Sequence, residues 1–307
     1  MVDTRPAVLC VVDRPWWAHD RKTEALTRAL AESFRIVRRY QAEVTEDDVA
    51  SADIVLLYYW LQVERIPWLE HVLRHDAKKL LIGICSHFEL DGPWREPGVA
   101  MLSSLPHTVF ANNRGLVETF EGVLGRRIVY TPNGVDTGVF VPASSPGSAG
   151  RFRVGWAGSL TNHGPGHRGV HEVIAPAVAA VEGAELALAA REDHWRGLEE
   201  MVGFYQSLDV YVCASRSEGT PNPCLEAAAS GLPIVTTRVG NMPELIVDGE
   251  NGFFFDRTVE GLASRLRRLR DDSALRRRMG AAARASVEPW DWSYRAVAYE
   301  AMFRELL

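Results

Sequence analysis

The segment from Val210 to Gly231 constrains the fold more than any other part of the chain. Its first five residues, 210–214, are apolar and are typical of a strand buried on both faces of a parallel sheet. A tight loop with two prolines follows, and from Pro223 onward the apolar residues take helical spacing until Gly231. Strand, loop and helix in this order predict a β–α unit of an α/β protein.

Two carboxylates, Glu218 and Glu226, lie eight positions apart in this loop and helix. Proline suits the first turn of a helix, and the free N–H groups of that turn, together with the helix dipole, favour a bound phosphate. Glu226 lies one turn into the helix, and helical side chains lean toward the N-terminus, so its carboxylate can reach a group held there. A phosphate beside hydroxyl-binding carboxylates fits a nucleotide sugar.

The rest of the chain alternates strands and helices in two halves, which predicts two parallel sheets with helices on both faces. A linker of small residues at 143–150 separates the halves. Arg-rich helices are expected over 259–285, and Pro289 interrupts the chain before a last helix over 294–306. The expected strands are 8–12, 36–37, 54–59, 80–85, 108–110, 128–130, 152–156, 186–190, 210–214, 234–237 and 253–255.

Composition excludes several classes of protein. A chain of 307 residues can hold two domains, and 47% hydrophobic with 24% charged residues is typical of a globular protein. The net charge of −6 argues against a general nucleic-acid binder. No apolar run approaches the roughly 18 residues of a membrane span. The arginines of 265–278 indicate a solvated helix face, with weak peripheral contact to a membrane surface as the alternative.

The four cysteines have no metal-binding spacing. Cys10, Cys85 and Cys213 lie in apolar, strand-like runs, which predicts buried, reduced thiols and a cytoplasmic protein. His163, His167 and His171 are spaced by four, but Gly164-Pro165-Gly166 breaks any helix that would bring them together. We therefore expect no metal site and no cofactor.

Several motifs resemble one known family. Glu218 to Glu226 matches the E-x7-E motif of the family GT4 retaining glycosyltransferases, which have the GT-B fold. Residues 230–237, 239–246 and 248–253 are similar to that family as well. Pro132-Asn133-Gly134-Val135-Asp136-Thr137 resembles the signature that ends its first domain. The resemblance covers most of residues 106–307, whereas residues 1–105 match loosely.

The resemblance implies two Rossmann-like α/β domains facing a cleft, with a C-terminal helix that crosses back to the first domain. Residues 1–145, with 291–307 crossing back, would bind the acceptor. Residues 151–290 would bind the nucleotide-sugar donor. The implied reaction is metal-independent transfer of a sugar from a nucleotide-diphosphate sugar to a hydroxyl acceptor (a glycan, a lipid-linked or a small molecule), with retention of the anomeric configuration.

The family also suggests roles for individual residues. Glu226 would bind the two ribose hydroxyls, and Glu218 would lie by the sugar and the reacting face. Arg168 would neutralise the diphosphate, and Ser159 stands where the family has its second basic residue. We expect Arg216, His163 or His167 to supply the missing charge. The loop residues that would contact the donor phosphate and sugar are Gly219, Thr220, Pro221 and Asn222.

In the first half, His87 follows an apolar strand at its carboxyl end, where parallel sheets bind ligands. The family often has a histidine there, near the donor sugar. Trp16 and Trp17 follow the first strand in place of a Gly-rich loop, with His19 two residues on. Indole rings offer flat faces to sugars or aromatic acceptors, so we expect these three residues to bind the acceptor. Packing of the first helix is the alternative for the tryptophans.

Two departures from the family leave other functions open. Only one helix, 193–206, fits between the strands at 186–190 and 210–214, so the second domain is trimmed where the base is usually held. The loss of the basic residue at Ser159 motivates a second hypothesis, a non-catalytic sugar-nucleotide-binding partner of another transferase. A GT-B phosphorylase or a hydrolase of activated sugars is the third. The sugar, base, acceptor and oligomeric state are not predicted.

Overall fold

The computed structural model describes residues 3–75, 79–104, 108–144 and 150–307. The chain forms two compact units. The first unit consists of Met1–Gly134 and Trp292–Leu307, and the second of Val135–Asp291. Each unit is built around one parallel sheet, as the alternation of strands and helices predicts.

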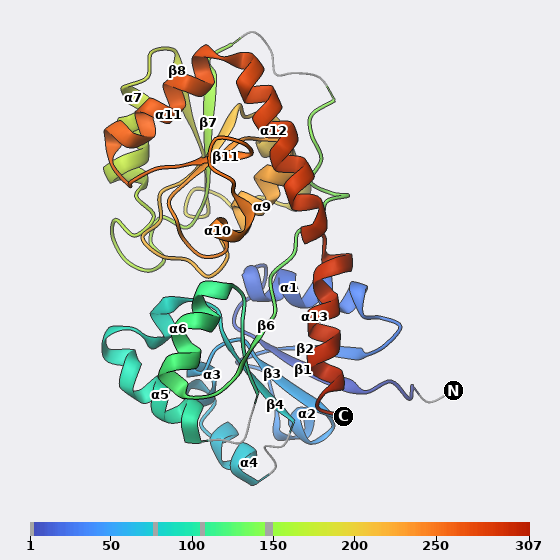
Figure 1. Cartoon of the computed structure of the whole chain (residues 1–307). Coiled ribbons are helices and arrows are strands. Elements are labelled where there is room, and N and C mark those ends of the chain that lie inside the picture. The colour runs from blue at the N-terminus through green and yellow to red at the C-terminus, as the bar shows by residue number, and fades with distance from the viewer. Residues whose placement is uncertain (1–2, 76–78, 105–107, 145–149) are drawn as a thin grey trace. The chain divides into compact units, whose positions relative to one another are not determined.

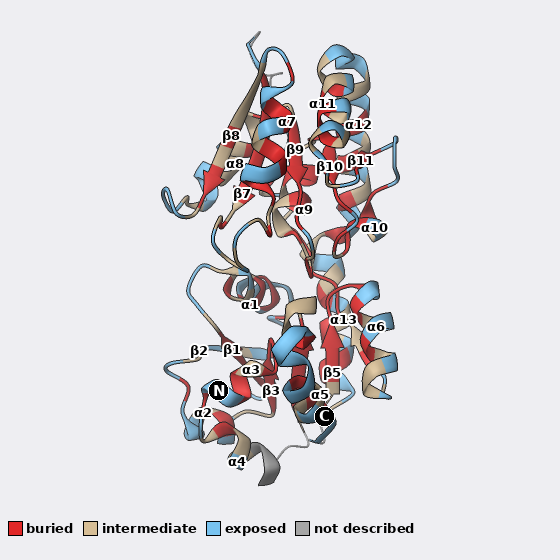
Figure 2. Cartoon of the chain, turned by 90° about the vertical axis from the view of Figure 1, so that its left-hand side faces the viewer, coloured by how far each residue is buried: buried red, intermediate tan, exposed pale blue. Residues whose placement is uncertain are grey.

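The first unit has a six-stranded parallel sheet in the order β2-β1-β3-β4-β5-β6. Its four inner strands are almost entirely buried, whereas β2 and β6 at the edges are partly exposed, which explains why the inner strands appear as apolar runs in the sequence (Figure 2). The strands are β1 (Ala7–Val12), β2 (Arg35–Tyr40), β3 (Ile54–Leu57), β4 (Leu80–Ile84), β5 (Thr108–Ala111) and β6 (Ile128–Tyr130).

Helices cover both faces of this sheet (Figure 1). One core layer joins the sheet to α2, α3, α5 and α6, and the other joins it to α1 and α13. The helices are α1 (Ala18–Ala29), α2 (Glu46–Ala50), α3 (Leu61–Arg65), α4 (Leu69–His75), η1 (His87–Leu90), η2 (Gly92–Trp94), α5 (Arg95–Ser104), α6 (Arg114–Leu124) and α13 (Trp292–Arg304).

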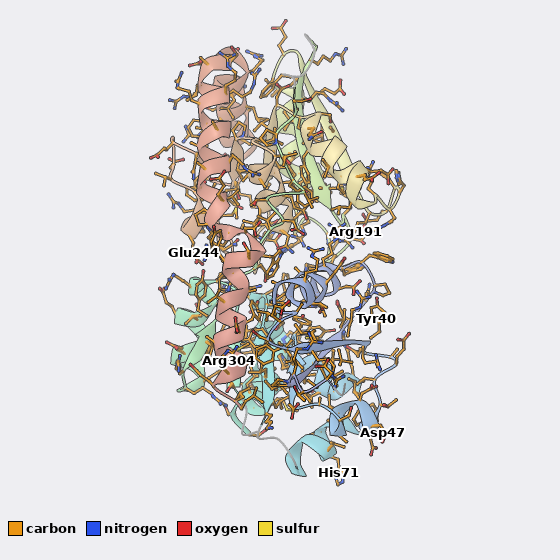
Figure 3. The ribbon with its side chains drawn as sticks, turned by 90° about the vertical axis from the view of Figure 1, so that its right-hand side faces the viewer. Tyr40, Asp47, His71, Arg191, Glu244 and Arg304 are labelled. Atoms are coloured by element: carbon orange, nitrogen blue, oxygen red, sulfur yellow. The ribbon has the colours of Figure 1, made fainter. Side chains whose placement is uncertain are left out.

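The last helix, α13, contributes side chains to the core of the first unit. Tyr299 and Phe303 are fully buried there, and Arg304 at its end bonds Glu300 at 2.6 Å (Figure 3). Lys22 of α1 is 3% exposed, and its ammonium lies 4.9 Å from the centre of the Tyr299 ring. The rings of Tyr58 and Phe110 complete an aromatic cage at 5.3 and 5.6 Å. A buried cation is thus held by cation–π contacts from three segments distant in sequence.

The second unit has a five-stranded parallel sheet in the order β11-β10-β9-β7-β8, again with helices on both faces. Its strands are β7 (Phe152–Gly158), β8 (Ala184–Ala190), β9 (Val210–Cys213), β10 (Ile234–Thr236) and β11 (Gly252–Phe254). Its helices are η3 (Val170–Ile174, one π turn), α7 (Ala175–Ala179), α8 (Leu198–Gln206), α9 (Asn222–Ala229), α10 (Met242–Leu245), α11 (Val259–Asp271), α12 (Ser273–Val287) and η4 (Glu288–Trp290).

The boundary between the units lies earlier than the sequence suggested. We expected residues up to 145 to belong to the first domain, but residues from Val135 onward lie with the second unit. The Val135 amide donates to the Trp290 carbonyl at 3.0 Å, and the Phe140 ring packs edge-on against Tyr205. These contacts hold the segment against the second core. The predicted linker falls largely on residues 145–149, which lie outside the described residues.

Two helix starts also differ from the prediction. The helix expected from residue 193 begins at Leu198, because Gly197 starts it and the Glu200 carboxylate accepts the Gly197 amide at 2.8 Å. In the first unit, the sequence pattern predicts an amphipathic helix over 23–32, whereas α1 begins at Ala18, since Asp20 in its first turn accepts the Trp16 amide at 2.7 Å. At both positions a local side-chain hydrogen bond sets where the helix begins, and the spacing of apolar residues does not reveal such a bond.

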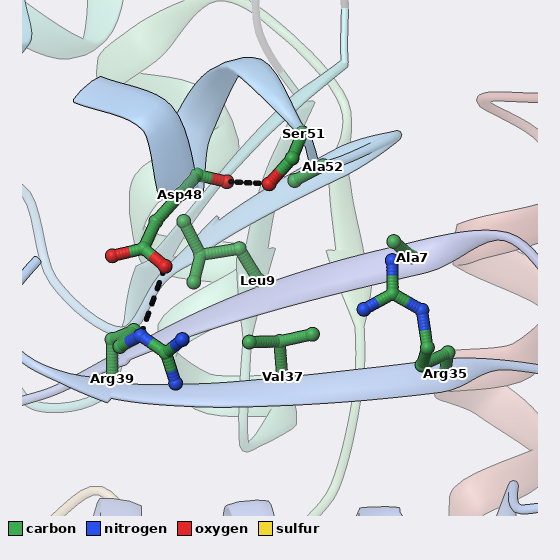
Figure 4. Close-up of a pocket in the computed structure, with 8 residues that line it drawn as sticks. All are labelled: Ala7, Leu9, Arg35, Val37, Arg39, Asp48, Ser51 and Ala52. Atoms are coloured by element: carbon green, nitrogen blue, oxygen red, sulfur yellow. Dashed lines mark hydrogen bonds and ion pairs between the residues drawn. The ribbon is translucent and has the colours of Figure 1, made fainter. Parts of the chain in front are cut away.

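A small groove in the first unit lies between α2 and the β1–β2 edge of the sheet (Figure 4). Arg39 Nε donates to Asp48 Oδ1 at 2.9 Å on one side of it. Asp48 also closes a capping box with Thr45, so the acid pair at 47–48 starts a helix, as expected. None of the candidate site residues lines this groove. Among the described helices, none is long and apolar enough to cross a membrane.

Candidate functional site

Three side chains converge beyond the carboxyl ends of β7 and β9 in the second unit. Arg168 lies on the loop after β7, and Ser215 and Glu218 follow β9. Arg168 Nη1 forms an ion pair with Glu218 Oε1 and lies 3.5 Å from Ser215 Oγ. Ser215 Oγ donates to Glu218 Oε1 at 2.7 Å. The fold thus brings together two of the three predicted catalytic residues, which are far apart in sequence.

This ion pair is largely removed from water. The side chains of Arg168 and Glu218 are 20% and 10% exposed. Burial lowers the pKa of the Arg168 guanidinium, and its buried Nε atom has no hydrogen-bond partner among the residues that the structure describes. Removing either partner would leave an uncompensated, partly buried charge, which is strongly destabilising. The pair is therefore both a candidate phosphate and sugar site and a structural element of the loop.

Arg257, which the sequence analysis did not single out, holds the Arg168 loop against β9. Its Nε donates to the Ala214 carbonyl at 2.8 Å and its Nη2 to the Gly166 carbonyl at 2.5 Å. Gly169 is required at this junction, because a Cβ there would lie 2.8 Å from the Ala214 oxygen and φ is +68°. Arg257 follows β11, and nothing in its sequence context indicates this role.

Burial and a neighbouring guanidinium disfavour the charged form of the two histidines beside Arg168. Burial, followed by repulsion from Arg168, lowers the pKa of His163 to about 4. The same two causes lower the pKa of His167, whose Nε2 donates to the Ser217 carbonyl at 2.9 Å. Which of Arg216, His163 and His167 supplies the missing charge stays a prediction, and Arg216 is exposed on this loop.

Ser159, which stands where the family has a basic residue, is bonded to an acid. Its Oγ donates to Glu192 Oε1 at 2.6 Å, and the Leu160 amide donates to Glu192 Oε2 at 3.0 Å. Partial desolvation acts to raise the pKa of Glu192. The hydrogen bonds from Ser159, Leu160 and Thr161 outweigh it and lower that pKa to about 2. Glu192 follows Arg191 on the loop after β8 (Figure 3). This departure therefore replaces a cation with a loop whose hydroxyl and amide groups are held by an ionised carboxylate.

The start of α9 presents fewer free amides than predicted. Pro221 and Pro223 have no N–H group, and the Asn222 and Cys224 amides donate to the Thr220 and Pro221 carbonyls at 2.9 and 2.8 Å. The prediction of free N–H groups is wrong for these two residues. Thr220 Oγ1 is buried without a partner. The helix dipole and the neighbouring side chains are therefore what the start of α9 can offer to a phosphate.

The backbone around Gly219 is packed tightly against a second loop. Gly240 has a φ of +54°, and a Cβ on it would lie 2.4 Å from the Gly219 carbonyl oxygen. Only glycine permits this approach. The loop that carries Glu218 is thus supported from one side by residues 239–241 and from another by Arg168.

Glu226 lies on α9 and accepts a hydrogen bond from a tyrosine of α8. The Tyr205 hydroxyl donates to Glu226 Oε2 at 2.6 Å, and Tyr205 is fully buried. Glu226 is half-buried. The sequence analysis placed Glu226 at the site but missed Tyr205, because an aromatic residue on a short amphipathic helix is more often only part of the core.

In the first unit, the predicted acceptor residues lie at the carboxyl end of β1. His19 Nδ1 is 3.2 Å from Asp13 Oδ1, and the His19 ring stacks on Tyr58 with centres 4.6 Å apart. Trp16 is 63% exposed with a φ of +65°, and Arg14 lies over the Trp17 ring at 5.0 Å. The structure therefore brings these residues to one sheet edge and adds Asp13 and Tyr58.

His87 begins η1, directly after β4, so it lies at the carboxyl edge of the same sheet as expected. Burial lowers its pKa, and its ring is 6.0 Å from that of Phe120. Its assigned role at the donor sugar stays a prediction. Among the described residues, no three of the His, Cys, Asp and Glu side chains gather as metal ligands would.

Two parallel-sheet units with polar side chains beyond the carboxyl ends of their strands define the GT-B class of glycosyltransferases, and solved structures of that class confirm the fold. The chain is similar to sucrose-phosphate synthase (tll1590) from Thermosynechococcus elongatus, with a TM-score of 0.78 and 15% identity over 98% of this chain and 99% of that one. Anabaena Alr3699/HepE in complex with UDP-glucose gives a TM-score of 0.75 and 15% identity over 96% and 99%.

Sequence comparison identifies the second unit more closely. Residues 194–286 match the family model of glycosyl transferases group 1, and they lie within a chain that has the GT-B fold. It is 32% identical to a D-inositol 3-phosphate glycosyltransferase of Arthrobacter sp., over 52% of this chain and 46% of that protein. It is 40% identical to sulfoquinovosyl transferase SQD2 of Arabidopsis thaliana, over 31% of this chain and 19% of that protein.

These matches span less than half of the curated relatives' own length. With the relative from Corynebacterium diphtheriae, also a D-inositol 3-phosphate glycosyltransferase, 37% identity extends over 34% of this chain and 25% of that protein. The relatives therefore support the family similarity of the second unit.

Proposed function

We propose that this chain is a retaining glycosyltransferase that transfers a sugar from a nucleotide-diphosphate sugar to a hydroxyl acceptor. The carrying observation is the convergence of Arg168, Ser215 and Glu218 at the edge of the second sheet, with Glu226 on the following helix. UDP and UDP-glucose are bound by the similar protein Alr3699/HepE. A nucleotide with two phosphates offers a partner for each of these groups.

In this proposal, the bond between the anomeric carbon and the β-phosphate oxygen breaks while the acceptor oxygen bonds to the same face of that carbon. The acceptor proton passes to the departing diphosphate. Arg168 and Arg216 stabilise the charge that develops on the leaving group, and charge stabilisation of this kind is usually the largest contribution to catalysis. Glu226 binds ribose and Glu218 orients the sugar. No step requires a metal ion.

The first unit binds the acceptor in this proposal. Exposed Trp16 and half-buried Trp17 offer flat apolar faces, and the Asp13–His19 pair offers hydrogen bonds beside them. His87 is proposed to contact the donor sugar. These assignments rest on the common carboxyl edge of β1 and β4, where parallel sheets bind ligands.

The primary experiment measures donor consumption by purified protein. The wild type is screened by thermal shift against UDP, GDP, ADP and dTDP, because a ligand at 100 times its dissociation constant adds about 2.7 kcal/mol of stability. The corresponding nucleotide sugar is then supplied with a panel of hydroxyl acceptors, and nucleotide release and the anomeric configuration of the product are measured. Inversion, or full loss of activity in EDTA that manganese restores, would contradict the mechanism.

One observation favours a second function. Ser159 and Glu192 leave the site without the second cation that the family uses. A non-catalytic sugar-nucleotide-binding protein would tolerate this loss. In that case the wild type would bind a nucleotide but release none from its sugar, with or without acceptors. A phosphorylase would instead require inorganic phosphate for donor turnover.

A further inference from the structure

Tyr205 occupies a position that is hard to explain by packing alone. It is the largest side chain that α8 buries, it is 0% exposed, and its hydroxyl reaches out of the core to donate to Glu226 Oε2 at 2.6 Å. A buried hydroxyl costs free energy unless it is hydrogen-bonded, and a phenylalanine would avoid that cost. The bond to Glu226 is therefore what accounts for a hydroxyl at this buried position.

The Tyr205 ring is fixed on several sides. Phe140 packs edge-on at 5.7 Å and Tyr211 at 5.9 Å between ring centres. Tyr211 is itself anchored to β7, since its hydroxyl accepts from the Ala157 amide at 3.1 Å and donates to the Ala157 carbonyl at 3.2 Å. A ring held in this way has little rotational freedom, so its hydroxyl oxygen stays at one place relative to the sheet.

The support of this ring is joined to the helix that carries Glu226. Arg284 of α12 donates to the Phe140 carbonyl at 2.8 Å and to the Ala229 carbonyl, in the last turn of α9, at 2.7 Å. A cation at the C-terminus of a helix is favourable. The phenylalanine that packs on Tyr205 and the helix of Glu226 are therefore tied to one side chain.

The hydrogen bond has a fixed direction at neutral pH. Burial, and then the negative charge of Glu226, raise the pKa of Tyr205 well above its ordinary value. The phenol therefore stays protonated and donates. Hydrogen bonds to charged acceptors are stronger than neutral ones and fix both partners. One oxygen of the carboxylate is thus oriented by the protein.

We propose that Tyr205 is a positioning residue for nucleotide binding, which holds the Glu226 carboxylate in the orientation that accepts the ribose hydroxyls. The inference rests on the proposed function, in which Glu226 binds ribose. It predicts that binding of the nucleoside part of the donor depends on the Tyr205 hydroxyl, whereas binding of the diphosphate part does not.

Tyr205→Phe tests this by removing one oxygen and keeping the ring. Tyr299→Phe is the matched control, because Tyr299 is an equally buried tyrosine in the core of the first unit whose hydroxyl donates to the Thr131 carbonyl at 2.9 Å. Affinity for the nucleoside diphosphate that binds the wild type best, and for its nucleoside, is measured by calorimetry. Tyr205→Phe should weaken both by about five- to tenfold, the effect of one bond to a charged group. Tyr299→Phe should leave both within about twofold.

A double-mutant cycle with Glu226→Gln separates positioning from general damage. If Tyr205 acts through Glu226, Tyr205→Phe should have little further effect once Glu226→Gln is present. Three results would each overturn this inference and leave the proposed function standing. They are unchanged affinity in Tyr205→Phe, equal losses in the two tyrosine variants, and additive effects of Tyr205→Phe and Glu226→Gln. A wild type that binds none of the four nucleotides would overturn the proposed function as well.

Discussion

The two sheet edges of this protein are built in opposite ways. At the edge of the second unit, nearly every polar side chain is committed to another protein group: Arg168 to Glu218, Tyr205 to Glu226, and Ser159 to Glu192. At the edge of the first unit, rings predominate, and Trp16 is 63% exposed. Under the proposed function, the difference teaches that a site for a charged donor is fixed by paired charges, whereas a site for an uncharged acceptor can offer flat apolar surface.

Side chains that are already paired also add a free-energy cost to ligand binding, which exposed rings do not. Arg168 and Glu218 satisfy each other, so a ligand phosphate must compete for a guanidinium that already has a partner. Exposed tryptophans lose only water on binding. We therefore expect substitutions in the second unit to affect both stability and donor use, and substitutions of Trp16 and Trp17 at the first edge to affect neither strongly.

The sharpest test of this contrast is Arg168→Ala. It should lower kcat/KM for the nucleotide sugar about a hundredfold, which corresponds to a few kcal/mol of lost charge stabilisation. It should also lower the melting temperature, because Glu218 is left buried and unpaired. In Arg168→Ala/Glu218→Gln, stability should return while activity does not. A double variant that regains activity would mean that Arg168 is structural only.

Glu226→Ala should have the next largest effect. Loss of two ribose hydrogen bonds should weaken nucleotide binding by about tenfold to a hundredfold. The measurement is calorimetry with the nucleotide that stabilises the wild type, on a variant whose folding is verified by circular dichroism. Unchanged affinity would sink the ribose assignment.

At the other edge, Trp16→Ala and Trp17→Ala should change nucleotide affinity less than about twofold, since neither ring contacts phosphate or ribose in our proposal. Their effect should appear as a higher acceptor KM, worth about 1 kcal/mol per lost ring face. His87→Ala should differ from both by lowering turnover with acceptor or water. Tryptophan variants that lose nucleotide binding as severely as Glu226→Ala would break the contrast between the edges.

The smallest expected effect concerns Glu192. Because its folded pKa is depressed to about 2, from an ordinary value near 4.5, its bonds stabilise the protein fully above pH 4.5. That stability is lost as the pH falls toward 2. Glu192 is exposed, so solvent screening limits the effect to about 1 kcal/mol or less. Glu192→Gln should flatten the acid limb of a denaturation curve between pH 5 and 2, and an unchanged limb would contradict this.

The sequence revealed most where function and local backbone coincide. Residues 210–231 predicted β9, its loop and α9, since a buried strand, prolines and a glycine stop are all local signals. The pairing of Arg168 with Glu218 was not readable, because it depends on β7 lying beside β9 in the sheet. Arg257 and Tyr205 were missed for the same reason. Each forms a hydrogen bond to a residue in a different element of the fold, at a distance in sequence that local patterns do not cover.

The histidines show a second limit. Residue type suggests that His163 and His167 can carry charge, but burial and a neighbouring guanidinium lower their pKa values. Likewise, the helix start at Pro221 indicated free amides, and turns within the loop use two of them. Both properties depend on neighbouring groups rather than on the residue itself.

The place of α13 has a consequence for the order of folding during synthesis. The first unit uses residues up to Gly134 and then Trp292–Leu307, so the ribosome makes the whole second unit before the first can close. Until Tyr299 and Phe303 emerge, one face of the first sheet is covered by α1 alone, and the Lys22 ammonium lacks one of its three aromatic contacts. The second unit is thus free to fold first, while the earlier segment waits with its apolar face open, a stage at which chaperone binding or aggregation would compete.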